Sequence, residues 1–380
     1  MRLTVLTHDG RAWSAPFPTV ADPTRTFVLA FGASGLIDRP AGVDELLRSV
    51  AGARVIGCST AGEIVGRTIR DGSLVVAIAE FERTTLDTAT ARVEAPGESF
   101  TAGETIAKAL LRSDLRGVLV LSDGLNVNGS ELVRGLNAVL PEYVVVTGGL
   151  AADGSRFQKT WVLEGTRLGA GIVTAVGFSG DAVQIGHGSR GGWDIFGPER
   201  RVTRSRGNVL FELDGRPALE LYRRYLGDRA DGLPATGLLF PLALRATADD
   251  ERHLVRTILA VDDAQQSLTF AGDIPTGWLA QLMSANFDRL VEGASTAAET
   301  ASAMTGTSQR GDSLAIAISC VGRRLVLGER AEEEVEATAE SLGGGTAQVG
   351  FYSYGEVSPF ASGRCDLHNQ TMTLTTVAER

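Results

Sequence analysis

A stretch of small and polar residues, Gly57 to Glu63 (Gly-Cys-Ser-Thr-Ala-Gly-Glu), holds side chains that could do chemistry. Its bracketing glycines let backbone N–H groups approach a ligand carboxylate at little steric cost. Glu63 could receive an ammonium group, so the loop would suit an amino acid; the alternative is that Glu63 only caps a turn or pairs on the surface. The candidate contacts are Cys58, Ser59, Thr60, Ala61, Gly62 and Glu63.

The glycine spacing of this loop resembles that of a phosphate-binding loop. Such a loop needs a lysine and then a serine or threonine after its last glycine. Here Glu63 stands where the lysine should be, and its carboxylate would repel phosphate. The pattern therefore excludes nucleotide binding through this loop.

Cys58 could serve as a nucleophile if a histidine lay within reach, because a thiol enzyme needs a base. His187 and His368 are the candidate bases. No nucleophile-plus-base signature is present, and a free cysteine commonly acts as a small buried hydrophobe. We therefore predict binding without turnover and no catalytic residue, with a Cys58-dependent hydrolase as the alternative.

A second group of candidate contacts lies near the C-terminus. If the chain is extended there, Tyr352 and Tyr354 share a face and could wall one pocket. Glu356, His368 and Asn369 follow on glycine-rich loops. The alternatives are that the tyrosines pack an interdomain surface and that Asn369 stabilises a turn.

His187 is a further candidate, at the end of an alternating strand. Its imidazole could bind the ligand or serve as an axial haem ligand. The alternative is a hydrogen-bonded histidine at the domain junction. No metal-ligand spacing occurs in the chain, so no metal site is predicted.

The elements that must position these residues repeat along the chain. A Gly-x4-Gly frame follows a strand-like run at Gly57, Gly149 and Gly350, and a helix-like segment precedes each copy. This pattern predicts one supersecondary unit used three times, over 26–95, 116–187 and 313–380. Apolar spacing also predicts a long helix over 277–304.

Alternating strands and helices predict an α/β protein with stacked mixed β-sheets flanked by helices. A chain of 380 residues favours two domains, and the turn-rich stretch at 188–198 marks the boundary. We expect domains at 1–190 and 191–380. The first and third glycine loops should face each other across a cleft between them, where ligand sites are common.

Composition narrows the classes of partner. The net charge of −10 without a basic patch argues against nucleic acid. The three cysteines lie far apart, which suits a reducing cytoplasm. No apolar run approaches the ~20 residues of a membrane helix. We expect a soluble cytoplasmic protein without a membrane anchor.

Several motifs together resemble the FIST sensory-domain family. They are Gly57–Glu63, the sequence from His187 through Gly192-Trp193 to Glu212–Ala218, Gly350–Glu356, and Leu367–Thr371. The resemblance covers nearly the whole chain. It implies a FIST N-terminal-like, ligand-sensing domain over 1–190 and a FIST C-terminal-like domain over 191–380.

The resemblance also implies a role in signal transduction. Members of the family are often joined to a kinase, chemoreceptor or cyclic-dinucleotide output domain, and this chain shows none. A signal would then pass to a separate partner of that kind. Amino acids are proposed ligands in the family, and some members are similar to haem-based nitric oxide sensors, so haem is the alternative cofactor.

Overall fold

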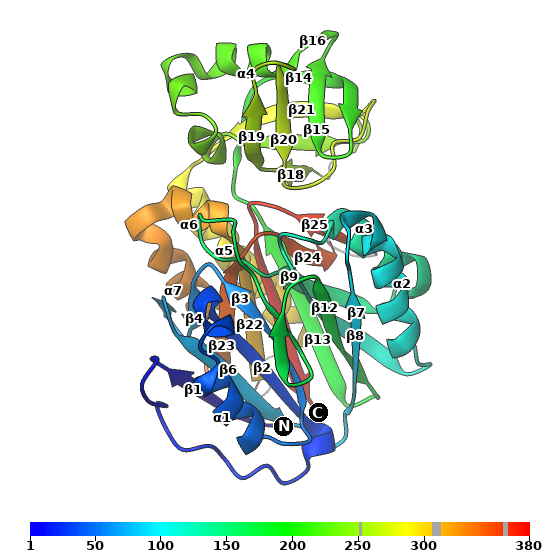
Figure 1. Ribbon diagram of the computed structural model, residues 1–380, viewed down its shortest axis with the longest axis vertical. Helices are drawn as coiled ribbons and strands as arrows, with labels where there is room; N and C mark the ends of the chain where they lie inside the picture. Colours follow the sequence, from blue (N-terminus) through cyan, green and yellow to red (C-terminus); the bar gives the residue numbers. More distant parts are fainter. Residues whose placement is uncertain (251–252, 306–312, 360–363) are drawn as a thin grey trace.

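The computed structural model describes residues 1–250, 253–305, 313–359 and 364–380. Figure 1 shows a large body with a smaller upper unit above it. The body holds three six-stranded mixed sheets, and the upper unit holds a fourth sheet of eight strands. The predicted α/β class, with mixed sheets flanked by helices, is confirmed.

The three sheets of the body have the same strand order. Their strands, in that order, have the following bounds. The first sheet runs β1 (Arg2–His8), β6 (Leu74–Glu80), β2 (Thr26–Ala33), β3 (Arg54–Thr60), β10 (Val162–Glu164) and β11 (Arg167–Gly169). The second runs β7 (Thr85–Arg92), β12 (Ile172–Ser179), β8 (Leu115–Ser122), β9 (Val145–Leu150), β24 (Glu356–Pro359) and β25 (Cys365–His368). The third runs β13 (Val183–Arg190), β26 (Met372–Glu379), β22 (Ser313–Cys320), β23 (Thr346–Ser353), β4 (Glu63–Val65) and β5 (Thr68–Arg70).

Each sheet has a parallel pair at its centre: β2 with β3, β8 with β9, and β22 with β23. After the second strand of the pair, the chain crosses to a neighbouring sheet and adds a hairpin there. The hairpin β4–β5 joins the third sheet, β10–β11 joins the first, and β24–β25 joins the second. The three repeats therefore interlock, because every sheet is completed by a different repeat.

These pairings confirm a threefold repeat, although the repeat boundaries differ from those predicted. Strand β7 was expected in the first repeat and β13 in the second. Instead β7 pairs with β12 of the second sheet, and β13 pairs with β26 of the third. Helix and strand order in a sequence does not determine which sheet an edge strand joins.

Helices cover the outer faces of the sheets (Figure 1). On β2, Leu29 and Phe31 pack into the centre of the body, whereas Val28 and Ala30 pack toward α1. Both faces of this strand are buried, as its continuous apolar run indicates. The body helices are α1 (Ala41–Ser49), α2 (Ser99–Leu110), α3 (Gly129–Val139), α5 (Phe287–Thr305), α6 (Val321–Leu327) and α7 (Ala331–Leu342), with short 3₁₀ helices η1 (Pro23–Arg25), η2 (Ser34–Ile37), η3 (Pro96–Glu98) and η6 (Gly328–Arg330).

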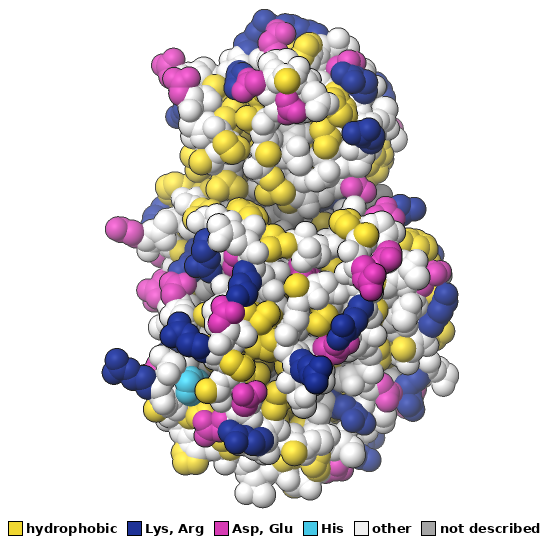
Figure 2. Space-filling view, viewed as in Figure 1, with side chains coloured by type: hydrophobic (Ala, Val, Ile, Leu, Met, Phe, Trp, Pro, Cys, Tyr) yellow, Lys and Arg dark blue, Asp and Glu magenta, His cyan; other side chains and the backbone are white. Residues whose placement is uncertain are grey.

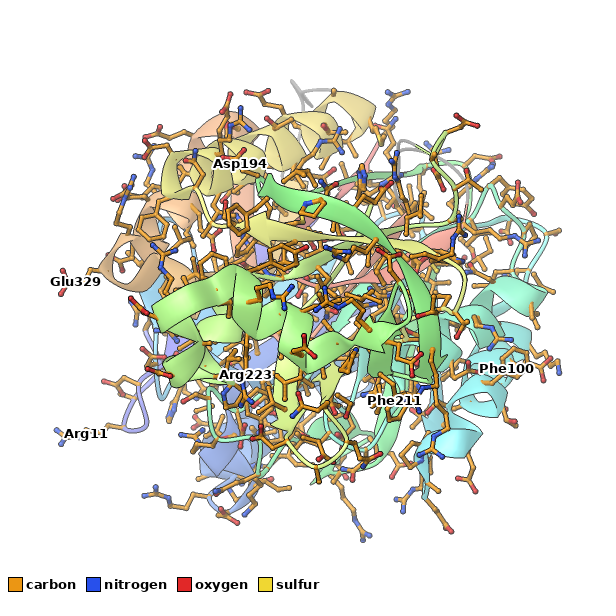
Figure 3. The ribbon with its side chains drawn as sticks, turned by 90° about the horizontal axis from the view of Figure 1, so that it is seen from above. Arg11, Phe100, Asp194, Phe211, Arg223 and Glu329 are labelled. Carbon is orange, nitrogen blue, oxygen red and sulfur yellow. The ribbon has the colours of Figure 1, made fainter. Side chains whose placement is uncertain are left out.

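The upper unit is an insertion in the third repeat, between β13 and α5. Seen from above, it lies over the body, with Arg223 on α4 and Phe211 on β15 (Figure 3). Its helices are α4 (Ala218–Leu226), η4 (Gly227–Gly232) and η5 (Ala235–Leu239). Its strands are β14 (Asp194–Arg206), β15 (Val209–Leu213), β16 (Arg216–Pro217), β17 (Leu242–Arg245), β18 (Leu254–Arg256), β19 (Ile258–Asp262), β20 (Ser267–Phe270) and β21 (Leu279–Ser284).

The spatial units cut across the two halves of the sequence. After the upper unit, the chain from 285 onward returns to the body and builds the third sheet with β13. The division into a FIST N-terminal-like domain at 1–190 and a FIST C-terminal-like domain at 191–380 therefore stays a prediction. The predicted helix over 277–304 is wrong at its start: Leu279–Ser284 form β21, which pairs with both β14 and β17, and α5 begins only at Phe287. Strand partners on both sides override the helical spacing of these apolar residues.

One glycine in each repeat is required by the close approach of the parallel strands. A Cβ on Gly57 would lie 2.4 Å from the main-chain oxygen of Ala30, and a Cβ on Gly350 would lie 1.8 Å from that of Ala317. In the second repeat the equivalent glycine is Gly148, opposite Val120, and not the predicted Gly149. The predicted Gly-x4-Gly pattern of the second repeat was therefore placed one residue too far along the sequence.

We predict that Gly350→Ala destabilises the protein. The new methyl group would overlap the backbone of β22, and overpacking of this kind costs typically ~1–3 kcal/mol or more. Thermal unfolding of Gly350→Ala and of a control, Gly344→Ala, measures the effect; a Cβ on Gly344 meets nothing within 4 Å. Equal melting temperatures for the two variants would contradict the steric role.

Candidate functional site

The three crossover loops that follow β3, β9 and β23 meet in the middle of the body. Each loop hydrogen-bonds to the other two through the backbone, so the contacts form a closed ring. The first and third loops thus lie against each other directly, without a cleft between them. The bonds run from Ala61 N to Tyr352 O (2.8 Å), from Leu150 N to Gly355 O (2.9 Å), and from Ala152 N to Ser59 O (3.0 Å).

Glu63 points into this packed region, where its side chain is 1% exposed. Its carboxylate accepts hydrogen bonds from Ser73 N at 3.0 Å, from Ser73 Oγ at 2.6 Å and from the Thr60 hydroxyl. Burial raises the pKa of Glu63. Its acceptor capacity is used within the chain, so no contact supports the predicted ammonium site.

Glu356 has the same arrangement in the third repeat. Its carboxylate accepts from Ser353 Oγ at 2.6 Å, and from Thr371 N at 3.3 Å and Thr371 Oγ1 at 3.0 Å. In the second repeat Asp123 accepts from the N–H of Gly171. In all three repeats a buried carboxylate binds the residue just before the strand that pairs antiparallel with the first strand of the parallel pair (β6, β12 and β26), which is a structural role.

Cys58 is fully buried on β3, opposite Val162 of β10. Burial raises the pKa of its thiol well above the ordinary value, whereas a nucleophilic cysteine needs a lowered one. Among the described residues, no hydrogen bond joins Cys58 to His187 or His368. The hydrolase alternative has no geometric support.

The two candidate histidines lie in separate places. His368 Nε2 is 2.9 Å from the main-chain oxygen of Ser358. His187 lies on β13, against α5, and burial lowers its pKa. A Cβ on Gly186 or Gly188, on either side of His187, would lie 2.1 Å from a main-chain oxygen of α5. This packing does not fit a haem held by His187.

A pocket of about 760 Å³ opens between the body and the upper unit. The molecule narrows there, and hydrophobic side chains gather on the visible face (Figure 2). The body contributes the ends of the second and third crossover loops and the first residues of α3 and α6. The upper unit contributes η5 and the residues around β19 and β20. Residues from the body include Leu125, Asn128, Leu150, Phe157, Cys320, Val321, Leu325, Tyr354 and Asn369, and those from the upper unit include Asn208, Pro234, Leu238, Thr257, Ile258, Leu259, Phe270 and Asp273.

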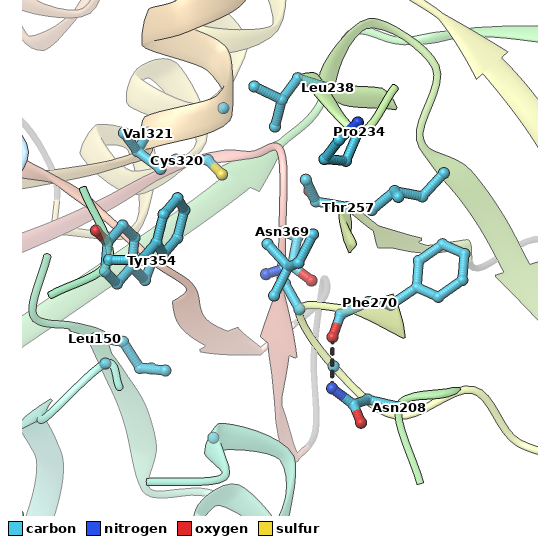
Figure 4. Close-up of a pocket in the computed structure, with 18 of the residues that line it drawn as sticks. Leu150, Asn208, Pro234, Leu238, Thr257, Phe270, Cys320, Val321, Tyr354 and Asn369 are labelled. Carbon is cyan, nitrogen blue, oxygen red and sulfur yellow. Dashed lines mark hydrogen bonds between the residues drawn. The ribbon is translucent and has the colours of Figure 1, made fainter. Parts of the chain in front are cut away.

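Most of the pocket wall is apolar, and its aromatic part is held rigidly. The ring of Tyr354 stacks on Phe157, with centroids 4.5 Å apart. The Tyr354 hydroxyl donates to Asp153 and lies 2.8 Å from the main-chain oxygen of Gly154. The stacking on Phe157 and the contacts of the hydroxyl together hold the Tyr354 ring in place. Figure 4 shows this ring on the body side of the pocket.

A few polar groups also lie at the pocket. In the part of the chain that the structure describes, neither amide atom of Asn369 has a hydrogen-bond partner, and neither has the hydroxyl of Thr257. Both side chains are buried, with exposed fractions of 1% for Asn369 and 4% for Thr257. Asn208 is already paired, since it donates to Phe270 O at 2.7 Å (Figure 4).

The structure places only part of the predicted binding set at this pocket. Tyr354 and Asn369 line it. Tyr352 does not share their surface. Strand β23 ends at Ser353, between the two tyrosines, and the Tyr352 hydroxyl donates to buried Glu334 at 2.9 Å. The other predicted contacts outside the lining are Cys58, Ser59, Thr60, Ala61, Gly62, Glu63, His187, Glu356 and His368.

Sequence reasoning missed the contribution of the upper unit and of α6. Thr257 lies between the short strands β18 and β19, and Phe270 ends β20; none of these segments carries a motif. Cys320 and Val321 begin α6 directly after the core strand β22. The helix start at Asn128 could have been used, since its side chain caps α3 by accepting from Glu131 N.

Comparison with known families decides the relationship. A family model for the FIST N domain matches residues 26–216, and a model for the FIST C domain matches residues 218–359. The chain belongs to the FIST family. FIST domains are associated with small-ligand sensing in signal transduction.

Other comparisons add little to the family assignment. No curated protein matches this FIST protein. A crystal structure of cyanuric acid hydrolase from A. caulinodans aligns over 100% of this chain and 99% of its own, at 9% identity and a TM-score of 0.33. A TM-score this low supports no inference. None of the helices in the described residues combines the length and apolar character needed to cross a membrane.

We predict that Glu356→Gln flattens the pH dependence of stability in this FIST protein. Burial raises the pKa of Glu356 to about 8 from an ordinary value of 4.5. Between these values the folded state keeps a proton that the unfolded chain has released. The stabilising contribution is therefore complete below the lower value and is lost as pH rises through the higher one.

Melting temperatures measured across that pH window, for wild type and Glu356→Gln, check this prediction. Exposed Glu45→Gln is the matched control and should follow the wild-type curve. If the wild-type and Glu356→Gln curves run parallel, Glu356 does not titrate in this window.

Proposed function

We propose that this FIST protein is a sensor that binds a small molecule in the pocket between the body and the upper unit. The observation that carries this proposal is the shared lining of the pocket. Tyr354 and Asn369 come from the body, and Thr257 and Phe270 come from the upper unit. The volume of about 760 Å³ and the mainly apolar wall are typical of small-molecule sites.

The shared lining supplies a physical route from binding to signalling. A ligand that contacts both units stabilises the arrangement in which both contacts are made. It would therefore change how often the upper unit occupies this position over the body. A separate protein that recognises one arrangement could read the change, and a kinase, a chemoreceptor or a cyclic-dinucleotide enzyme is the proposed class of partner.

An amino acid remains one proposed ligand, although not through Glu63. Asp273 is an acidic residue at the pocket and could receive an ammonium group. The N-terminal residues of α3, Asn128 and Gly129, also line the pocket, and helix N-termini favour anions. No comparable observation favours hydrolysis, because Cys58 lies outside the pocket.

The proposal is tested by a thermal-shift screen over amino acids and other small metabolites. A ligand present at 100 times its Kd adds ~2.7 kcal/mol to the stability of the state that binds it. The expected result is a metabolite that raises the melting temperature and competes for the pocket. A screen in which nothing binds the pocket would count against the function.

We predict that Leu325→Trp weakens binding of any such metabolite without destabilising the free protein. Leu325 lines the pocket and is 47% exposed, so a larger ring can occupy the pocket mouth without disturbing the core. Leu111→Trp is the control, since Leu111 is equally exposed at 46% but lies outside the pocket. Titration calorimetry on both variants decides; equal affinities would place the ligand elsewhere.

A further inference from the structure

We propose that the pocket selects an uncharged ligand carrying a hydrogen-bond donor and acceptor side by side, as an amide or lactam does, on an apolar body. The inference rests on the proposed function, since it concerns the same pocket. It differs from the amino-acid hypothesis in the charge and head group of the ligand.

The first step concerns charge. Among the described residues that line the pocket there is no lysine, arginine or histidine. A ligand carboxylate would lose its hydration there without gaining a cationic partner, and burying an unpaired charge is strongly unfavourable. Apart from the N-terminus of α3, the described lining therefore offers an anion no positive group.

One cation buried at this junction, Arg256, already has partners within the chain. Arg256 of β18 is 2% exposed and donates to the main-chain oxygens of Asp273, Val255 and Leu367 at 3.0–3.2 Å. These bonds join the upper unit to the body at Leu367. Arg256 does not line the pocket, so it does not neutralise a bound acid.

The second step concerns Asn369. Its amide is buried at the pocket, and neither Nδ2 nor Oδ1 has a hydrogen-bond partner among the described residues. Folded proteins pair nearly all buried polar atoms, because an unpaired one destabilises the fold. Keeping an unpaired amide at a pocket wall indicates a partner that arrives with the ligand.

The chemistry of that partner follows from the amide itself. Its carbonyl oxygen accepts and its NH2 group donates, and the two lie side by side. A ligand meets both at once when it presents a donor next to an acceptor, as the edge of an amide, lactam or urea does. A carboxylate offers only acceptors and an ammonium offers only donors, so each would leave half of Asn369 unpaired.

The third step concerns the opposite wall. Thr257 of the upper unit lies across the pocket from Tyr354, and its buried hydroxyl has no hydrogen-bond partner among the described residues (Figure 4). The ring of Phe270 points away from Tyr354 into the core of the upper unit. Aromatic side chains pack favourably against flat apolar groups. The polar head of the ligand would lie near Asn369, and its apolar body would pack against the ring of Tyr354.

The test uses four sets of fragments matched in size: neutral lactams and secondary amides, carboxylates, amines, and free amino acids. Ligand-observed NMR at millimolar concentration measures binding of each set to the wild-type protein and to Asn369→Leu. Leu325→Trp identifies the binding that takes place in the pocket.

The expected result is that neutral amides bind the pocket and that Asn369→Leu weakens them about tenfold. Asn369→Leu should melt no lower than wild type, because it removes an unpaired amide. Asn137→Leu is the control, since Asn137 is paired with the main-chain oxygen of Cys365 at 2.8 Å, and it should melt lower.

The outcomes separate this inference from the proposed function. Pocket binding by carboxylates, amines or amino acids in preference to amides would overturn the ligand class and leave the sensor intact. Absence of pocket binding by all four sets would overturn both. Unchanged amide affinity in Asn369→Leu, or a loss of stability equal to that of Asn137→Leu, would show that Asn369 has only a structural role.

Discussion

The body depends on the closed ring of backbone hydrogen bonds between its three crossover loops. Each loop leaves its own sheet and must reach a neighbouring one, so the three loops pass through the same small volume at the centre of the body. Only small residues allow backbones to come this close, and Gly57, Gly148 and Gly350 stand where a side chain would meet the neighbouring strand. Removing any one loop would leave one sheet without its outer hairpin.

The buried carboxylates complete this arrangement. Backbone N–H groups that precede β6, β12 and β26 cannot join a strand ladder at the crossover, and a buried donor needs a partner. Glu63, Asp123 and Glu356 supply that partner in the three repeats. Glu63 and Glu356 hold equivalent positions after the second strand of their parallel pairs, whereas Asp123 supplies the bond from the end of the first strand, β8.

A buried ion pair in the body holds the two segments that lead to and from the upper unit. Arg323 and Glu334 are both fully buried and lie 2.7 Å apart. Arg323 also donates to the main-chain oxygens of Gly191 and Leu290, which lie on the two segments that lead to and from the upper unit. Breaking a buried pair typically costs ~3–5 kcal/mol, so both segments start from a fixed base beside the pocket.

Much of the fold was predictable because local sequence patterns determine its strands and helices. The apolar runs at β2, β8 and β22 and the helix start at Asn128 follow directly from composition and spacing. The repeat was visible in its glycines. The candidate site was harder to predict from the sequence. Burial decides whether a polar residue stabilises the fold or contacts a ligand, and a sequence motif does not reveal burial. Glu63 and Asn369 were both predicted ligand contacts. Glu63 accepts hydrogen bonds from Thr60 and Ser73, whereas the Asn369 amide has no partner among the described residues.

The pocket lies where the threefold pattern is broken. The first crossover, with Glu63, meets only other repeats and is closed by Arg324, which donates to Ala61 O and pairs with Asp71. The second and third crossovers carry Leu150 and Tyr354 and meet the inserted upper unit instead. An insertion has its own core, built from residues such as Phe270 and Tyr222, and so does not have to interlock with the body. A cavity can therefore persist between the body and the upper unit without destabilising the core of either. This is the condition for a site whose bound ligand changes the position of the upper unit relative to the body.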